Sequence, residues 1–158
     1  MSPTVIKPQV WQHWREAHRM ALLAAFEDST TGTRVREFCK GLARDLGSDC
    51  RITEHVWLFN TLRLRELQEI AAEEASASDL IIISIHQSGT VPDEVKAWID
   101  LWQQHGNRHQ AILLALLDPS YEGASSAVES YLQKVASRGG MEFLVGSGAV
   151  PDVRWQSE

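Results

Sequence analysis

The sequence predicts one α/β domain with three layers, in which helices cover both faces of a doubly wound, five-stranded parallel sheet in the order 2-1-3-4-5. Two observations predict this fold. Five short apolar runs alternate with segments whose apolar residues recur at helical spacing, as in strands joined by right-handed helical crossovers. The length of 158 residues also suits a single domain with a full hydrophobic core.

The five predicted strands differ in how much of each is expected to be buried. Their ranges are 20–26, 50–58, 80–85, 111–117 and 141–145. The third and fourth are apolar at every position, which is typical of central parallel strands covered on both faces. The second alternates instead, with Ile52 and Val56 on one face and His55 on the other, so we expect it at an edge of the sheet. This edge position is what the order 2-1-3-4-5 requires.

Helical spacing connects these strands over 34–46, 64–71, 92–105 and 125–137. Gly47 suits the position after a helix end, and Pro92 suits the first turn of a helix. Residues 1–19 are predicted to form a helical extension, 20–150 the domain and 151–158 a tail. Trp11 and Trp14 in the extension are expected to fold back on the domain or to form an oligomer interface.

Composition excludes several classes of function. The net charge is −6 and no long basic run occurs, so no nucleic-acid partner is expected. No apolar run approaches the roughly 20 residues of a membrane helix, and the first residues lack a signal-peptide pattern. Cys39 and Cys50 follow neither a redox nor a zinc spacing, so we expect reduced thiols and a cytoplasmic protein without a metal site.

Ligands of such sheets bind beyond the carboxyl ends of the strands, where the order of the strands reverses. The loops expected there are 27–33, 86–92, 118–123 and 146–151. The first contains Ser29, Thr31 and Gly32 before an amphipathic helix, where free N–H groups and the helix dipole favour an anion. The same residue types are suited to capping the helix without any ligand, and we favour this interpretation, with Asp28 or Ser29 as the cap.

Two of these loops resemble flavodoxins. Ser29, Thr31 and Gly32 match the flavin-phosphate pattern, whereas Thr33 and Arg34 depart from it after the glycine. The segment 118–122 resembles the flavodoxin segment after strand four, so Tyr121 would stack on the flavin. The resemblance spans about residues 20–148 and implies a flavodoxin-like, Rossmann-like fold with FMN as a candidate cofactor. Under this resemblance, the residues that would bind the FMN phosphate are Ser29, Thr31, Gly32, Thr33 and Arg34.

The pair Glu27 and Asp28 resembles the Mg²⁺-binding acidic pair of response-regulator receivers. A receiver also needs a phosphate-accepting aspartate after strand three and a lysine after strand five. Here strand three leads into His86 and strand five into 146–148, without either residue. The segments 28–34, 57–60 and 84–98 also resemble small bacterial proteins with no assigned role. That resemblance does not indicate any particular activity.

His86 and Asp118 are the candidates for acid–base chemistry, because they follow neighbouring predicted strands. The leading hypothesis is nevertheless a non-catalytic module for a small anionic ligand or a protein partner. The residues expected to line the ligand site are Ser29, Thr31, Gly32, Arg34, His86 and Tyr121. The alternatives are an FMN-dependent redox protein and a hydrolase or transferase that uses His86 and Asp118.

Overall fold

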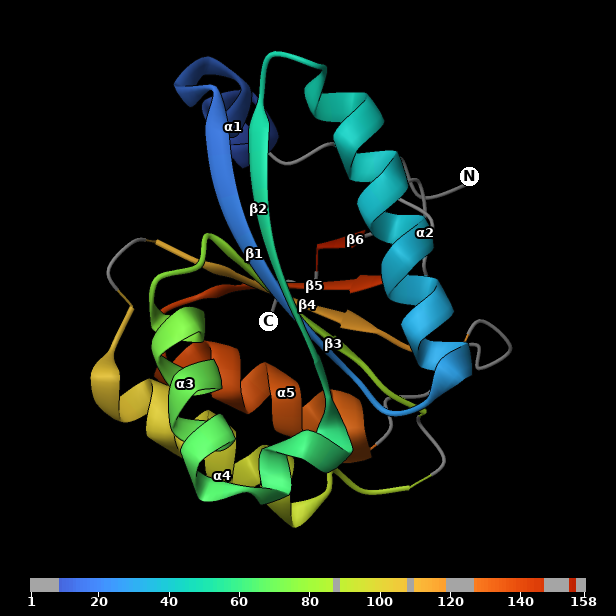
Figure 1. Cartoon of the computed structure of the whole chain (residues 1–158), viewed down its shortest axis with the longest axis vertical. Coiled ribbons are helices and arrows are strands. Elements are labelled where there is room, and N and C mark those ends of the chain that lie inside the picture. Colours follow the sequence, from blue (N-terminus) through green and yellow to red (C-terminus); the bar gives the residue numbers. More distant parts are fainter. Residues whose placement is uncertain (1–8, 87–88, 108–109, 119–126, 147–153, 156–158) are drawn as a thin grey trace.

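A computed structural model describes residues 9–86, 89–107, 110–118, 127–146 and 154–155. Five parallel strands form the predicted sheet in the order β2-β1-β3-β4-β5, with β2 at the edge (Figure 1). They are β1 (Arg19–Phe26), β2 (Arg51–Leu58), β3 (Leu80–Ser84), β4 (Ile112–Leu116) and β5 (Glu142–Gly146). The short strand β6 (Arg154–Trp155) pairs antiparallel with β5, inside the segment predicted to be a tail.

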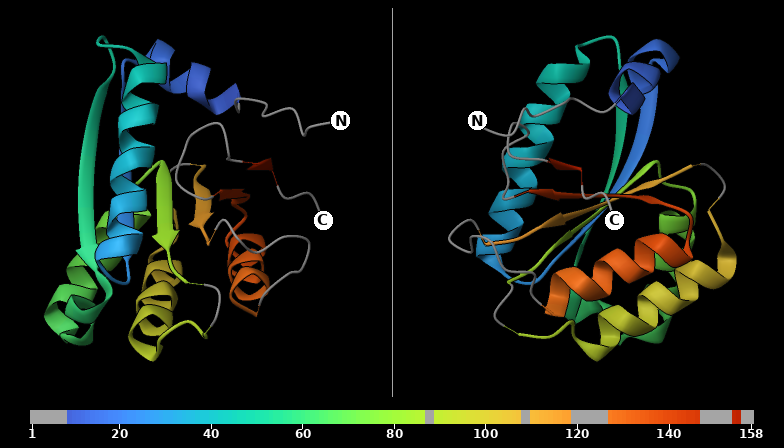
Figure 2. Two further views of the ribbon diagram at one scale, coloured as in Figure 1. Left: turned by 90° about the vertical axis from the view of Figure 1, so that its right-hand side faces the viewer. Right: turned by 180° about the vertical axis from the view of Figure 1, so that it is seen from behind.

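Helices cover both faces, as the alternating pattern predicts (Figure 2). The helices are α1 (Gln9–Ala17), α2 (Ser29–Leu46), α3 (Arg65–Ser76), α4 (Asp93–His105) and α5 (Ala127–Arg138), and a 3₁₀ turn η1 (Phe59–Arg63) precedes α3. α2 lies on one face, while α3, α4 and α5 lie on the other. The fold is therefore the three-layer, flavodoxin-like arrangement that the sequence predicts.

Strand alternation divides the core between the two faces. In β1, Leu22 packs in the cluster of α2 with Phe38, whereas Leu23 packs in the cluster of α3, α4 and α5. β3 and β4 are buried at every position, as expected for central strands. Trp98 and Trp102 of α4 are fully buried with ring centroids 5.2 Å apart, so both tryptophans are core residues.

The structure differs from the prediction at the start of α2. This helix begins at Ser29, five residues before the expected Arg34, so only Glu27 and Asp28 separate it from β1. The reason is the strong cap at Asp28 described below. At the N-terminus, Trp14 is 3% exposed and packs in the core of the domain.

Candidate functional site: a histidine between two carboxylates at the strand mouths

His86, just beyond β3, links two other segments at the carboxyl edge of the sheet. Its Nδ1 lies 2.9 Å from Asp118 Oδ1, and its Nε2 lies 2.9 Å from Asp28 Oδ2. Asp118 follows β4 and Asp28 follows β1, so the ring joins the ends of three neighbouring strands. Its own main-chain N–H donates to the carboxylate of Glu27 at 3.1 Å. His86 is thus the centre of the cluster.

Asp28 also caps α2. Its carboxylate accepts a hydrogen bond from the N–H of Thr31 at 2.9 Å, and the Thr31 hydroxyl accepts from the N–H of Asp28 at 2.8 Å. This reciprocal pair is a capping box, which satisfies donors that the first helical turn leaves free. The Asp28 carboxylate therefore occupies the end of the helix where an anion would otherwise bind.

The hydroxyl and the glycine of the predicted phosphate loop both have structural tasks. The Thr31 hydroxyl is buried and also accepts from the N–H of Glu27 at 2.8 Å. A Cβ at Gly32 would lie 2.9 Å from the ring of Phe26, so the glycine permits this ring to pack on the helix. The Thr33 hydroxyl donates to the carbonyl of Ser29 within the helix. These contacts account for the motif as a helix start.

Arg34 reaches the same cluster from the second turn of α2. Its Nη1 lies 2.8 Å from Asp118 Oδ1, the atom that also contacts His86. The side chains of Arg34 and Asp118 are 16% and 24% exposed, whereas that of Asp28 is 47% exposed. Solvent therefore reaches the carboxylate of Asp28 more readily than the side chains of Arg34 and Asp118.

The charges of the cluster favour a protonated histidine. The pKa of His86 is raised, chiefly by its hydrogen bond to Asp118 and then by that to Asp28. The pKa of Asp28 is lowered, chiefly by the hydrogen bond from the Thr31 N–H. With an imidazolium and Arg34 facing Glu27, Asp28 and Asp118, the cluster keeps one excess negative charge. When His86 is protonated, its ring donates from both nitrogens, and neither nitrogen is then free to accept a proton from a substrate.

The structure brings three of the predicted site residues into one cluster. His86 and Asp118 are in direct contact, and Arg34 contacts Asp118 as well. The sequence suggested the pair of His86 and Asp118 only because the two residues follow neighbouring strands. The contact between His86 and Asp28 was not expected, and the only signal for it was the acidic pair after the first strand. Tyr121 lies outside the described residues.

A further contact, which the sequence did not predict, holds the end of β3 against α2. Ser84, the last residue of β3, is fully buried and donates its hydroxyl to the carbonyl of Thr31 at 2.8 Å. This bond ties β3 to the first turn of α2, beside the cluster. A serine at the end of an apolar run was the only sequence signal available.

Among the described residues, no group of three or more His, Cys, Asp and Glu side chains is arranged to hold a metal ion. In the same part of the chain, no helix has the length and hydropathy needed to cross a bilayer. Cys39 is largely buried near Glu54, which raises its thiol pKa to about 12, chiefly through burial. This thiol is therefore a poor nucleophile at neutral pH.

No family model, curated protein or solved structure shows significant similarity to this chain. Inferences about its function therefore rest on the geometry of the site.

Proposed function

We propose that the protein is a non-catalytic binding module for a small anionic ligand, which binds where Asp28, His86 and Asp118 meet. The main support for this proposal is the geometry of His86, whose two ring nitrogens both contact carboxylates at 2.9 Å. A general base needs one nitrogen free to accept a proton, and this arrangement offers none. It favours binding over acid–base catalysis.

The ligand class follows from what Asp28 does. Its carboxylate takes the two donors that an anion would use here, the N–H of Thr31 and the Nε2–H of His86. Because this carboxylate is half exposed, it is able to turn outward and give both donors to a ligand oxyanion. The excess negative charge of the cluster opposes such a ligand, so we expect weak binding while Asp28 is present.

The test replaces Asp28 by serine. Serine is also a preferred N-cap, so Asp28→Ser keeps α2 capped while it frees Nε2 of His86 and removes one negative charge. We expect affinity for inorganic phosphate to rise at least about tenfold, equivalent to about 1.4 kcal/mol. The measurement is a phosphate titration followed by the ring-proton NMR signals of His86. Asp49→Ser, which removes an exposed carboxylate from a loop beyond the other end of α2, is the matched control.

An unchanged phosphate affinity in Asp28→Ser, or equal gains in both variants, would contradict the proposal. Parallel titrations with FMN address the flavin hypothesis. If FMN binds far more tightly than phosphate at His86 and develops a bound-flavin absorbance spectrum, the redox alternative replaces the proposal.

One observation favours a second function, a hydrolase or transferase. The contact between His86 Nδ1 and Asp118 is the geometry by which a carboxylate orients a catalytic imidazole. Catalysis would require Asp28 to leave Nε2. Under this alternative, Asp28→Ser hydrolyses an activated ester such as p-nitrophenyl acetate faster than wild type, and Asp28→Ser/His86→Gln loses the gain. Equal rates in the two variants would exclude a role for the imidazole in this reaction.

A further inference from the structure

A second feature lies at the opposite end of the sheet from His86. β1 and β2 begin before their neighbours, since the first residue of β3, Leu80, pairs with Leu22 in the middle of β1. The first residues of this two-stranded ribbon extend beyond α3 and α4, as Figures 1 and 2 show. α1 and α2 lie against one face of the ribbon, and no helix of the described part of the chain covers the other face at its first residues.

Two arginines lie side by side on this uncovered face. Arg19 of β1 pairs directly with Arg51 of β2 in the parallel register, and both are exposed. The next residues, Met20 and Ile52, pack in the cluster of α2, so alternation places both arginines on the opposite face. No ion pair joins either guanidinium to a carboxylate in the described part of the chain.

This arrangement is unfavourable unless an anion offsets it. Like charges directly opposite on neighbouring strands repel, and the charge of an arginine cannot be removed by deprotonation. Because the two arginines are direct partners in the register, their guanidiniums together supply several N–H donors in the planar geometry that carboxylate and phosphate oxygens accept. The pair therefore has the chemistry of an oxyanion clamp.

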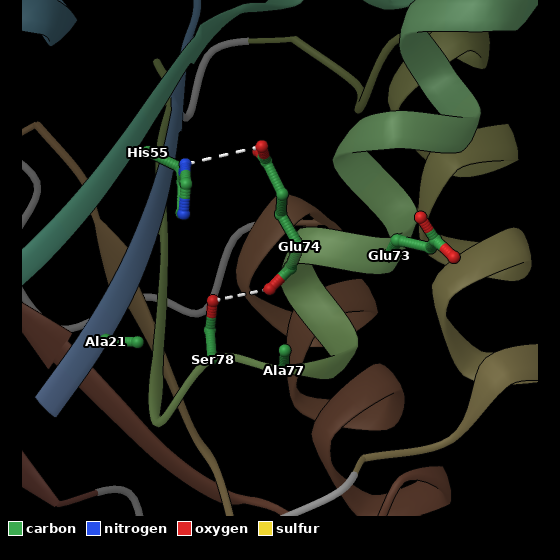
Figure 3. A pocket seen from close by; sticks show the side chains of 6 residues that line it. All are labelled: Ala21, His55, Glu73, Glu74, Ala77 and Ser78. Atoms are coloured by element: carbon green, nitrogen blue, oxygen red, sulfur yellow. Dashed lines mark hydrogen bonds and ion pairs between the residues drawn. The ribbon is translucent and has the colours of Figure 1, made fainter.

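A pocket of about 270 Å³ opens on the same face, two residues along β1 from Arg19 (Figure 3). Its lining is Ala21, His55, Glu73, Glu74, Ala77 and Ser78. His55 Nδ1 and Glu74 Oε2 face each other at 3.3 Å, while the carboxylate of Glu73 points away. The second oxygen of Glu74 accepts from the indole N–H of Trp57 at 2.8 Å.

We infer that the Arg19–Arg51 pair and this pocket form a binding site for a small organic anion. Its carboxylate or phosphate group lies between the guanidiniums, and its body enters the pocket. A two-residue step along a strand is about 6.6 Å, a distance that an arginine side chain spans. The pocket volume lies just below the range that is typical of ligand sites, which limits the ligand to a small molecule. Glu74 repels a second anionic group, so the end of the ligand inside the pocket is neutral or a hydrogen-bond donor.

The experiment titrates the full chain with inorganic phosphate and, separately, with acetate. It follows the side-chain Nε–H signals of Arg19 and Arg51 and the main-chain amide signals of Ala21 and His55 by NMR. We expect saturable shifts with at least one anion, and the anion that binds more tightly identifies the oxyanion of the ligand. Arg19→Gln and Arg51→Gln should each weaken binding at least tenfold, while Arg36→Gln, on the exposed side of α2, should not.

Thermal melting curves of the variants would establish whether they remain folded. Without ligand and at low salt, Arg51→Gln should melt at the wild-type temperature or above it, because the repulsion with Arg19 is gone. Phosphate or acetate should then raise the melting temperature of wild type more than that of Arg51→Gln. Shifts that do not saturate would mean an adventitious ion only and would overturn the inference. Equal affinities in wild type and both glutamine variants would overturn it as well. These signals are distinct from those of His86, so the result is independent of the function proposed above.

Discussion

Replacing Thr31 by valine would test whether the hydroxyl at the start of α2 stabilises the fold or serves a ligand. Valine has nearly the same shape, so the substitution removes the hydroxyl without opening a cavity. In the structure this hydroxyl accepts hydrogen bonds from the N–H groups of Glu27 and Asp28, each at 2.8 Å. The residue itself is fully buried. Thr31→Val therefore leaves two main-chain donors without their acceptor.

The magnitude follows from these two donors. An unsatisfied buried donor costs about 1–3 kcal/mol. The side chains of Glu27 and Asp28 are exposed, so water reaches their amides in part and the lower half of that range applies. With two such donors, we expect Thr31→Val to lower the free energy of unfolding by about 2–4 kcal/mol. Thr31→Ser, which keeps the hydroxyl and loses one methyl group, should cost about 1 kcal/mol.

The assay is urea unfolding followed by tryptophan fluorescence, with the free energy extrapolated linearly to water. Thr33→Val is the matched control, because the Thr33 hydroxyl is exposed and bonds only within the helix. Its effect should stay within about 0.5 kcal/mol. If Thr31→Val is no less stable than the control, the hydroxyl does not stabilise the helix start. Loss of phosphate binding without loss of stability would instead assign it to a ligand.

Three further predictions concern the same region. The raised pKa of His86 contributes stability that is complete below its unfolded value of about 6.5 and is lost as the pH rises through the higher folded value. Urea midpoints of wild type should therefore fall between about pH 6 and pH 9 by more than those of His86→Gln, and parallel curves would refute this. Gly32→Ala should lower the melting temperature despite the better helix propensity of alanine, because its Cβ would lie 2.9 Å from the Phe26 ring; a rise in melting temperature would show that the ring moves freely. Cys39, with a thiol pKa of about 12, should react with a maleimide at neutral pH far more slowly than free cysteine, and a comparable rate would contradict its burial.

The sequence was sufficient for the sheet and its order. Ranges 80–85 and 111–117 are apolar throughout, and the structure places β3 and β4 there with every residue buried. The alternation around His55 correctly placed β2 at the edge. These features could be predicted because hydrophobic periodicity is a local property, visible in consecutive residues of the sequence. Hydrophobic spacing alone started α2 five residues late, at Arg34, because a capping box depends on hydrogen bonds rather than on apolar periodicity. The expectation of a cap at Asp28 or Ser29 was correct, and the structure places the cap at Asp28.

The candidate site was predictable only in part. The neighbouring strands suggested that His86 and Asp118 lie close together, and they are in contact. The second contact of His86, with Asp28, depends on the rotamers of both side chains and on the exact start of the helix. The pairing of Arg19 with Arg51 depends on strand register, since a shift of one residue would place the two side chains on opposite faces.

By itself, the sequence determined the elements, their order and the edge of the sheet at which polar residues gather, because hydrophobic periodicity and strand connection rules act locally. The tertiary structure decided what those residues do. It converted the hydroxyls and glycine after β1 into a helix cap packed on Phe26, and it placed His86 between two carboxylates. Such contacts join residues up to 58 positions apart, and only the packing of strands and helices brings those atoms within hydrogen-bond distance.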